Sequence, residues 1–285
     1  MLKSLVIFLF SLSFSSVAVS APDRIASGTV GTDEILLDLL KGEEGRIVAV
    51  SHFAEDSRYS FISSVPKSIK GRVGGNIENL LLLKPDLVFI ASYTAASISE
   101  QLKAAKVKVH VQKSFGSFRD IKENIREVGT LIGKTKESNA MVSGMETKVS
   151  EALKKQAPCA RKPSFLQYVA SDFLPGKDTI IDDVGEIAGY HNILRDIDWK
   201  GWTQISQEIL VQQKPDVIIA SAADAPNKEE FLKKLRASAA WQKMDAVKQG
   251  NVLFVPDRLL YTVSQHATEL VTFLIENRPC SVRKN

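Results

Sequence analysis

The chain contains little cysteine and little histidine. Two cysteines and four histidines occur among its 285 residues. Two cysteines cannot build a four-cysteine zinc or iron–sulfur site, nor a scaffold rich in disulfides. The four histidines lie far apart in the sequence and form no metal-ligand motif. We therefore expect no resident metal and no intrinsic cofactor.

An excess of charge of one sign is also missing. There are 37 Lys and Arg residues against 33 Asp and Glu residues, and the net charge is +4. A nucleic-acid-binding domain would show a clustered stripe of basic residues, but the Lys and Arg residues of this chain are spread evenly along the sequence. Hydrophobic residues make up 44% and charged residues 25%, close to the averages of globular proteins. The even spread of charge excludes nucleic-acid binding. The ordinary composition excludes the disordered, collagen-like and coiled-coil classes.

Motifs of catalysis are absent as well. The sequence has no G-x-S-x-G, G-x-x-x-x-G-K-[ST], G-x-G-x-x-G or H-E-x-x-H pattern. Ser64 and Lys67 match the minimal S-x-x-K pattern, but Pro66 lies between them and the partner motifs are missing. The pair Asp182–Asp183 falls at a predicted helix start, where the helix dipole accounts for it. We predict that the protein is not an enzyme, and an exported α/β enzyme is the alternative from another class.

Long apolar runs are confined to the N-terminus. Lys3 precedes the apolar stretch Leu5–Phe14, and Ala18 and Ser20 occupy positions −3 and −1 of a cleavage site before Ala21. This is the pattern of a secretory signal peptide of twenty residues. The alternative is a membrane anchor, but a span needs about 20 apolar residues. No cysteine lies near the cleavage site, so we expect a periplasmic protein without a lipid anchor.

Export changes how the two cysteines are interpreted. Cys159 and Cys280 could pair in an oxidising compartment, and the bond would tie the C-terminal tail to the chain near Cys159. Two free thiols are the alternative.

An internal repeat is the most informative feature of the sequence. The segment Glu78–Ser92 recurs as Glu208–Ser221, at an offset of about 130 residues. Both segments contain the sequence Lys-Pro-Asp. In each copy a short helix starts near the glutamate and ends before the proline, which cannot continue it. An unbroken apolar run follows, typical of a strand buried on both faces of a parallel sheet. The repeat predicts two equivalent lobes.

Each half alternates strands with helices. We predict an α/β fold with two doubly wound lobes and parallel-type sheets, at residues 21–116 and 158–285. Beyond the repeat, strands are expected at 24–28, 46–51, 107–111, 164–170 and 251–255, and helices at 32–40, 180–189 and 231–236.

The segment between the lobes, residues 117–157, has no proline before its end. Ile121, Ile125 and Val128 recur at helical spacing. We predict one long connecting α-helix, and a helical hairpin that belongs to one lobe is the alternative. A stiff connector of this kind permits only small hinge motion, so we expect a largely preformed cleft between the lobes.

Six motifs in order carry a resemblance to a known family. The chain resembles the periplasmic solute-binding proteins of ABC importers, and more narrowly the members that bind cobalamin, ferric siderophores and haem. The motifs lie at residues 28–40, 46–51, 74–92, 182–193, 202–221 and 241–257. The resemblance implies a periplasmic receptor that captures a metal chelate and delivers it to an inner-membrane permease. We place a ferric siderophore first, cobalamin second and haem third; a ligand-free docking or sensor protein is a further alternative.

The resemblance also implies a role for two glutamates. In the family, one glutamate on each lobe docks into arginine-lined pockets of the permease dimer, and Glu78 and Glu208 stand at those positions. The alternative for each is a solvated carboxylate that is favourable at a helix N-terminus. We expect a monomeric receptor with the ABC permease dimer as its partner.

The ligand is expected between the lobes, at the carboxyl ends of the strands. Trp202, six residues before Glu208, matches a pocket aromatic of the cobalamin-binding members. Arg72 stands six residues before Glu78, where those members often carry tryptophan, and an arginine suits an anionic ligand. For each candidate, the alternative to ligand contact is that its side chain packs on its own lobe. The other cleft candidates are His52, Phe53, Tyr93, Phe173, Leu174, Arg258 and Tyr261, whereas His110, His191 and His266 are expected to be structural.

Overall fold

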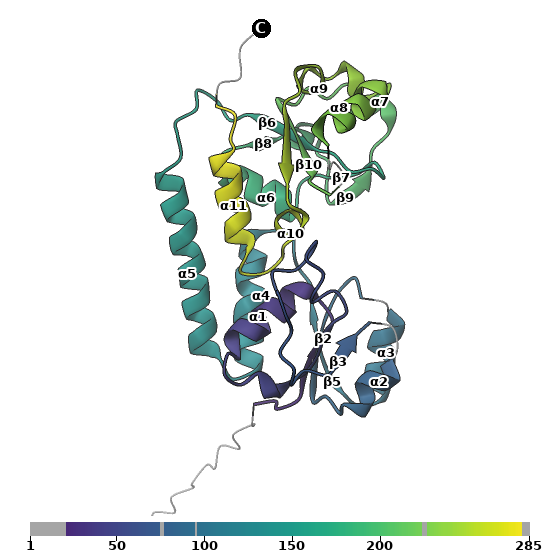
Figure 1. Ribbon diagram of the computed structural model, residues 1–285, viewed down its shortest axis with the longest axis vertical. Coiled ribbons are helices and arrows are strands. Elements are labelled where there is room, and N and C mark those ends of the chain that lie inside the picture. Colours follow the sequence, from purple (N-terminus) through teal and green to yellow (C-terminus); the bar gives the residue numbers. More distant parts are fainter. Residues whose placement is uncertain (1–20, 75–76, 95, 224–226, 281–285) are drawn as a thin grey trace, which may run out of the picture.

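The computed structural model describes residues 21–74, 77–94, 96–223 and 227–280. The predicted signal peptide lies outside these residues. Two α/β lobes are stacked along the long axis of the molecule, and a layer of helices runs beside them (Figure 1). In the described part of the chain, no helix combines the length and the apolar character that a membrane span needs.

The N-terminal lobe is built on a five-stranded parallel sheet. Its order is β3-β2-β1-β4-β5, so the strand order reverses between β1 and β4. Every residue of β2 and β4 is buried, as the unbroken apolar runs predicted. The strands are β1 (Ile25–Ser27), β2 (Ile47–Ser51), β3 (Gly71–Val73), β4 (Leu87–Ala91) and β5 (Lys108–Gln112), and the helices are α1 (Val30–Leu39), α2 (Ile77–Leu82) and α3 (Ala96–Ala104).

The C-terminal lobe has a four-stranded parallel sheet of order β11-β10-β6-β8. Its strands are β6 (Ser164–Gln167), β8 (His191–Asn192), β10 (Val217–Ser221) and β11 (Val252–Val255). A separate antiparallel ribbon pairs β7 (Phe173–Pro175) with β9 (Trp202–Gln204). The helices are α6 (Ile180–Ile187), α7 (Gln207–Leu210), α8 (Lys228–Ala237), α9 (Asp245–Gln249), α10 (Asp257–Leu260) and α11 (Ala267–Glu276). The α/β class with parallel sheets in two lobes is therefore confirmed.

The aspartate of each repeat performs the same structural task. Asp86 accepts hydrogen bonds from the backbone N–H groups of Asp23 (2.9 Å) and Arg24 (3.2 Å), at the start of β1. Asp216 accepts from the backbone N–H (2.7 Å) and the hydroxyl (2.9 Å) of Ser164, at the start of β6. In both lobes this carboxylate fixes the beginning of the strand that pairs with the strand of the repeat. The aspartate at the same position of each repeat thus makes the same kind of contact in each lobe.

The connector differs from the expected single helix. It forms a hairpin of α4 (Phe118–Leu131) and α5 (Thr135–Lys154). The chain turns at Gly133, whose φ of +76° lies in the left-handed region that favours glycine. A Cβ on Gly129 would lie 2.2 Å from the Ser138 hydroxyl, so glycine permits the two helices to approach closely. The prediction of one long helix was wrong, because helical periodicity on either side of a turn resembles that of a continuous helix.

The hairpin joins the two lobes into one core. The α4 side chains at Ile121, Ile125 and Val128 are fully buried. They belong to one hydrophobic cluster that contains Phe89 of the N-terminal lobe and Phe165 of the C-terminal lobe. In Figure 1, α5 runs along the lobes and packs beside α11. Continuous packing of this kind opposes large movements between the lobes, because the core would have to be broken.

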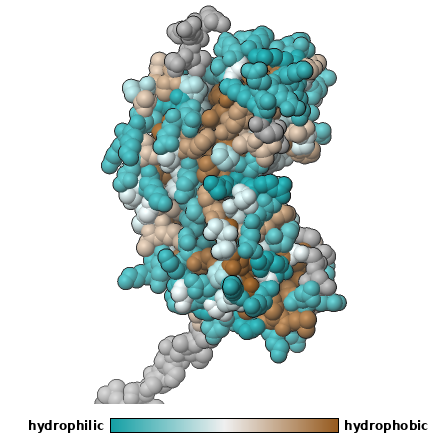
Figure 2. Space-filling view, in the orientation of Figure 1, coloured by the Kyte–Doolittle hydropathy of each residue, from teal (hydrophilic) through white to brown (hydrophobic). Residues whose placement is uncertain are grey.

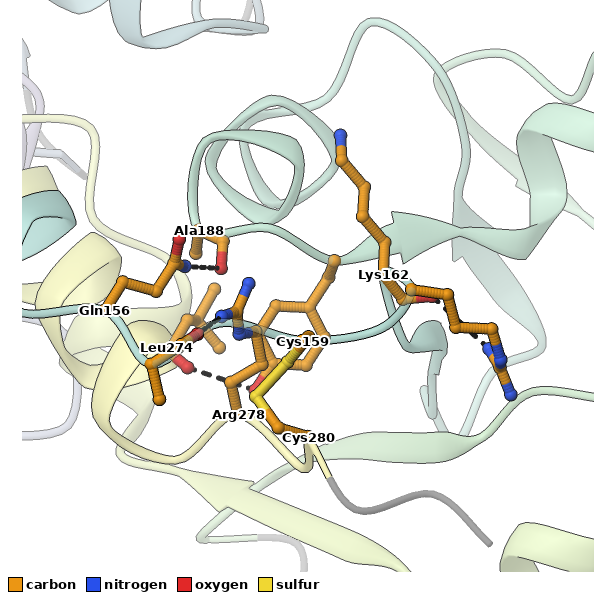
Figure 3. The surroundings of a disulfide bond; sticks show 10 residues. Gln156, Cys159, Lys162, Ala188, Leu274, Arg278 and Cys280 are labelled. Carbon is orange, nitrogen blue, oxygen red and sulfur yellow. Dashed lines mark hydrogen bonds between the residues drawn. A yellow bond between two sulfur atoms is a disulfide. The ribbon is translucent and has the colours of Figure 1, made fainter. Parts of the chain in front are cut away.

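The two cysteines form the disulfide that the sequence suggested. Cys159 and Cys280 are bonded, with their Cα atoms 5.0 Å apart. The bond joins the chain that leaves α5 to the chain that leaves α11 (Figure 3). The Arg278 guanidinium donates to the carbonyl of Ala157, and the Tyr190 hydroxyl donates to the carbonyl of Leu274 (3.1 Å). The end of α11 is therefore fixed by one covalent bond and by hydrogen bonds around it.

Candidate ligand-binding cleft

A cavity of about 430 Å³ lies at the carboxyl ends of the N-terminal strands. Its wall includes residues 28–31, which lead from β1 into α1, residues 51–53 at the end of β2, and Tyr93 after β4. Residues 261–263, which follow α10, close it from the other lobe. Carboxyl ends of parallel strands next to a reversal of strand order are where open α/β sheets bind ligands. The cavity therefore lies where the sequence predicted a cleft.

Four of the predicted cleft residues reach this cavity: His52, Phe53, Tyr93 and Tyr261. The rings of His52 and Phe53 are 3.8 Å apart, and the His52 Nδ1 atom lies 3.4 Å from the carbonyl oxygen of Val73. Tyr93 is 70% exposed and its ring lies 5.6 Å from that of Phe115. These residues line the cavity from three different loops.

Phe173 and Trp202 form a second aromatic surface. They lie on the β7–β9 ribbon, where Phe173 is opposite Gln204 and Trp202 is opposite Pro175. Because side chains alternate along a strand, Phe173 and Trp202 share one face of the ribbon. They are 45% and 46% exposed. Figure 1 places the ribbon on the side of the C-terminal lobe that faces the N-terminal lobe.

Other predicted residues do not line the cavity. Leu174, on the opposite face of β7, is fully buried in the core of the C-terminal lobe, so its expected contact with ligand was wrong. Arg72 lies on β3, and its guanidinium donates to Glu55 Oε2 at 2.6 Å. The Arg258 guanidinium lies over the ring of Phe61, 5.1 Å from its centroid. Both arginines are thus already engaged within the protein.

Tyr59 and Glu34 line the cavity although the sequence analysis did not single them out. Tyr59 belongs to the loop that follows β2, and its ring packs edge-on to Phe53 at 5.8 Å. The tyrosines, taken together, could have pointed to Tyr59 as a cavity residue. Of the five tyrosines in the chain, three line the cavity and the other two, Tyr168 and Tyr190, are buried.

Glu34 marks a junction between the lobes. Its carboxylate accepts hydrogen bonds from the backbone N–H of Phe61 (2.8 Å) and from the Ser264 hydroxyl. Gln265 Nε2 donates to the Glu34 carbonyl (3.2 Å) and to Asp38 Oδ2 (2.7 Å). Burial raises the pKa of the Glu34 carboxyl, although the hydrogen bonds from Phe61 and Ser264 oppose the shift. The floor of the cavity is therefore held by contacts between α1 and the segment before α11.

The histidines outside the cavity each lie beside a carboxylate. His110 Nε2 lies 3.2 Å from Glu127. His191 lies 2.8 Å from Asp196 and 3.3 Å from Glu186. His266 lies 3.2 Å from Glu269, and its ring stacks on Phe61 with the centroids 4.1 Å apart. These contacts agree with the structural roles that the sequence suggested. Within the described residues, no cluster of three or more His, Cys, Asp or Glu side chains is suited to hold a metal ion.

Asp33 contacts the wall of the cavity through Ser51. Its carboxyl group is completely buried and accepts hydrogen bonds from the backbone N–H (3.0 Å) and the hydroxyl (2.5 Å) of Ser51, which lines the cavity. Burial raises the pKa of Asp33 to about 7, although hydrogen bonds from Ser51 and Ser27 oppose the shift. This carboxyl group therefore takes up a proton in the folded protein at a higher pH than in the unfolded chain.

The variant Asp33→Asn is expected to change the pH dependence of stability. Between about pH 4 and pH 7, the folded state of the wild type holds a proton on Asp33 that the unfolded state releases. This group thus lowers stability as the pH rises through that range. Asparagine does not titrate, so the melting temperature of the variant should depend less on pH across this range than that of the wild type. Asp23→Asn, at a side chain that is 84% exposed, should keep the wild-type slope. An unchanged slope in Asp33→Asn would contradict the assignment.

The two lobes, the helical hairpin and the aromatic cavity between the lobes define a two-lobed solute-binding protein. Residues 25–259 match the family described as periplasmic binding protein. The match spans most of the chain, and the chain belongs to this family, whose members include substrate-binding proteins of ABC transporters.

Three curated relatives show the range of the family. The chain is 26% identical over 229 residues to the uncharacterized ABC transporter substrate-binding lipoprotein YvrC of Bacillus subtilis, covering 74% of this chain and 69% of the relative. It is 24% identical to a cobalamin-binding protein of Halobacterium salinarum, covering 72% and 55%. It is also 24% identical to the iron(3+)-hydroxamate-binding protein YxeB of Bacillus subtilis, covering 69% and 63%. The chain spans about half to two thirds of the length of these relatives.

Solved structures share the fold. A possible iron-binding periplasmic solute-binding protein from Staphylococcus epidermidis superposes with a TM-score of 0.77 at 23% identity, covering 90% of this chain and 98% of that one. The haem-binding protein RhuT from Roseiflexus sp. RS-1 gives a TM-score of 0.72 at 20% identity, covering 89% and 97%. At these identities the likeness establishes the fold.

Proposed function

We propose that this substrate-binding component of an ABC transporter captures a metal chelate in the cleft and delivers it to an inner-membrane permease. The distribution of exposed aromatic side chains carries the proposal. In the described part of the chain, every large aromatic side chain that is clearly exposed lies at the cavity or on the β7–β9 ribbon: Phe53, Tyr59, Tyr93, Phe173, Trp202 and Tyr261. Aromatic walls with a few polar groups suit a flat, largely apolar ligand.

The relatives indicate which chelates to consider. Proteins similar to this chain are named for cobalamin and for ferric hydroxamate, and a structural neighbour binds haem. We place an iron chelate of the siderophore type first and cobalamin second, with haem as the alternative. The protein would act in transport without catalysis, as a periplasmic monomer.

Ligand titration tests this function. Protein purified from the periplasm of an expressing host is titrated with cobalamin, haemin and a ferric trihydroxamate, and both visible absorbance and melting temperature are recorded. A ligand that binds only the folded state should stabilise it by about 2.7 kcal/mol at a hundredfold excess over its Kd.

A paired variant locates the binding site. The double variant Tyr93→Ala, Trp202→Ala should weaken binding by about tenfold or more, because two aromatic contact surfaces are lost. Leu153→Ala, at an exposed leucine on α5, is the control and should bind like the wild type. If none of the chelates binds, the proposed function is wrong. If the double variant binds with unchanged affinity, the cleft is not the site.

A further inference from the structure

The wall of the cavity has an unusual distribution of charge. Its polar side-chain groups are hydroxyls of serine, threonine and tyrosine, the imidazole of His52 and the carboxyl of Glu34. Within the described residues, Glu34 is the one lining side chain with a formal charge, and that charge is negative. Its two oxygens already accept hydrogen bonds from Phe61 and Ser264. In the part of the chain that the structure describes, the wall therefore offers an incoming ligand tyrosine side chains and no Lys or Arg side chain.

Two arginines near the cavity are held by carboxylates, and a third, Arg258, lies over the ring of Phe61. Arg72 donates to Glu55 at 2.6 Å and to the Gly71 carbonyl at 3.0 Å. Arg58 forms two hydrogen bonds with Asp56, at 3.0 and 2.6 Å. A guanidinium with a carboxylate partner is a strong and directional pair. To neutralise a ligand anion, either arginine would first have to leave its carboxylate.

Resting on the proposed function, we infer that the cleft selects chelates whose outer surface is neutral or cationic over anionic ones. The chemical class is a ferric hydroxamate or an amide-rimmed corrinoid, in preference to the carboxylates of haem or of carboxylate siderophores. An anion that enters this cleft loses water and meets no Lys or Arg side chain among the described residues of the wall, and burying an unpaired charge in an apolar site is costly. Neutral amide or hydroxamate groups can instead accept hydrogen bonds from the hydroxyls of Tyr59 and Tyr93.

Glu55 is the positioning residue in this arrangement. It holds Arg72 through Oε2 and accepts from the backbone N–H of Val65 through Oε1 at 3.0 Å. Its carboxylate pairs with the charge of Arg72 on β3. A glutamine at this position keeps an acceptor for Val65 and removes the negative charge. The Arg72 guanidinium is then free to pair with an anion on the ligand.

Matched ligand pairs test the inference, because the members of each pair differ mainly in charge. The first pair is the ferric complex of a linear trihydroxamate with a free amine and its N-succinyl derivative. The second pair is cyanocobalamin and its monocarboxylic acid, and the third is the dimethyl ester of haemin and haemin itself. Kd values are measured by fluorescence quenching for the wild type, for Glu55→Gln and for Glu44→Gln. Glu44 is a matched control, since it lies in the turn Glu44–Arg46 before β2 and its carboxylate accepts from Gly42.

For each scaffold that binds, the wild type should bind the neutral or cationic member about tenfold or more tightly than the anionic one. Glu55→Gln should narrow this preference several-fold, and Glu44→Gln should leave it unchanged. Equal or tighter binding of the anionic members would overturn the inference while the proposed function stands. An unchanged preference in Glu55→Gln would overturn the role of the Arg72–Glu55 pair. Binding of none of the six compounds would reject the proposed function, and the inference with it.

Discussion

Charge reversal of Glu78 and Glu208 together, each to arginine, is expected to reduce uptake to the level of cells that lack the protein. The affinity for the ligand should stay unchanged. Both glutamates lie in the first turn of a short helix, Glu78 in α2 and Glu208 in α7. Both are exposed. A receptor that presents one carboxylate from each lobe can pair with the two equivalent subunits of a permease dimer.

The position of these helices supports the docking role. Figure 1 shows α2 and α7 on the same side of the molecule, away from α5. Hydrogen bonds from its own backbone N–H and from Ser206 hold the pKa of Glu208 below its usual value, so this carboxylate stays ionised near neutral pH. Opposite charges across an interface set register and rate of encounter, and like charges placed there repel. Arginine at both positions would therefore repel the arginine-lined pockets that the family resemblance implies.

The matched control reverses two exposed glutamates on α5. The double variant Glu137→Arg, Glu151→Arg carries the same change of charge on the opposite side of the molecule. It should transport like the wild type. Uptake of radiolabelled ligand by whole cells and a Kd for the purified proteins separate docking from binding. Normal uptake by the Glu78, Glu208 variant would refute the docking role, and weakened ligand binding would show that the substitutions disturbed the fold.

Much of the fold could be predicted because its strands are short, apolar and repeated. The residues of β4 and β10 are buried on both faces, and an unbroken apolar run is the pattern that such strands require. The connector could not be predicted in the same way. The helical period continues through Gly129 and Gly133, and only the close approach to Ser138 and the φ of Gly133 show that the chain reverses there.

The cleft was predictable in part for a related reason. Strand ends identify His52, Phe53 and Tyr93 as loop residues at the carboxyl edge of the sheet. The sequence does not reveal contacts between residues that are distant along the chain. The pairing of Arg72 with Glu55 and the hydrogen bond from Ser264 to Glu34 join residues 17 and 230 positions apart. These partners decide which charges the cleft presents, and they appear only in three dimensions.

Replacement of both cysteines by serine is expected to lower the free energy of unfolding by about 4 kcal/mol, because the bond between Cys159 and Cys280 closes a very long loop. The two residues are 121 positions apart in the sequence. Loop-closure entropy for a loop of this length gives about 4 to 5 kcal/mol at 25 °C. In a protein of this size the melting temperature should fall by about 10 °C. Urea unfolding of the oxidised wild type, the reduced wild type and the double variant measures the effect.

Ligand affinity should survive this change. The hydrogen bonds from Arg278 to Ala157 and from Tyr190 to Leu274 still hold the end of α11. The bond therefore stabilises mainly by restricting the unfolded chain, so the reduced wild type and the double variant should unfold at the same urea concentration. Both should also show a steeper dependence on urea than the oxidised protein, since an unfolded chain without the cross-link exposes more surface. A loss below about 1 kcal/mol, a small part of the loop-closure value, would show that the unfolded chain is already restricted in other ways. If the double variant bound ligand more weakly, the bond would instead shape the folded lobe itself.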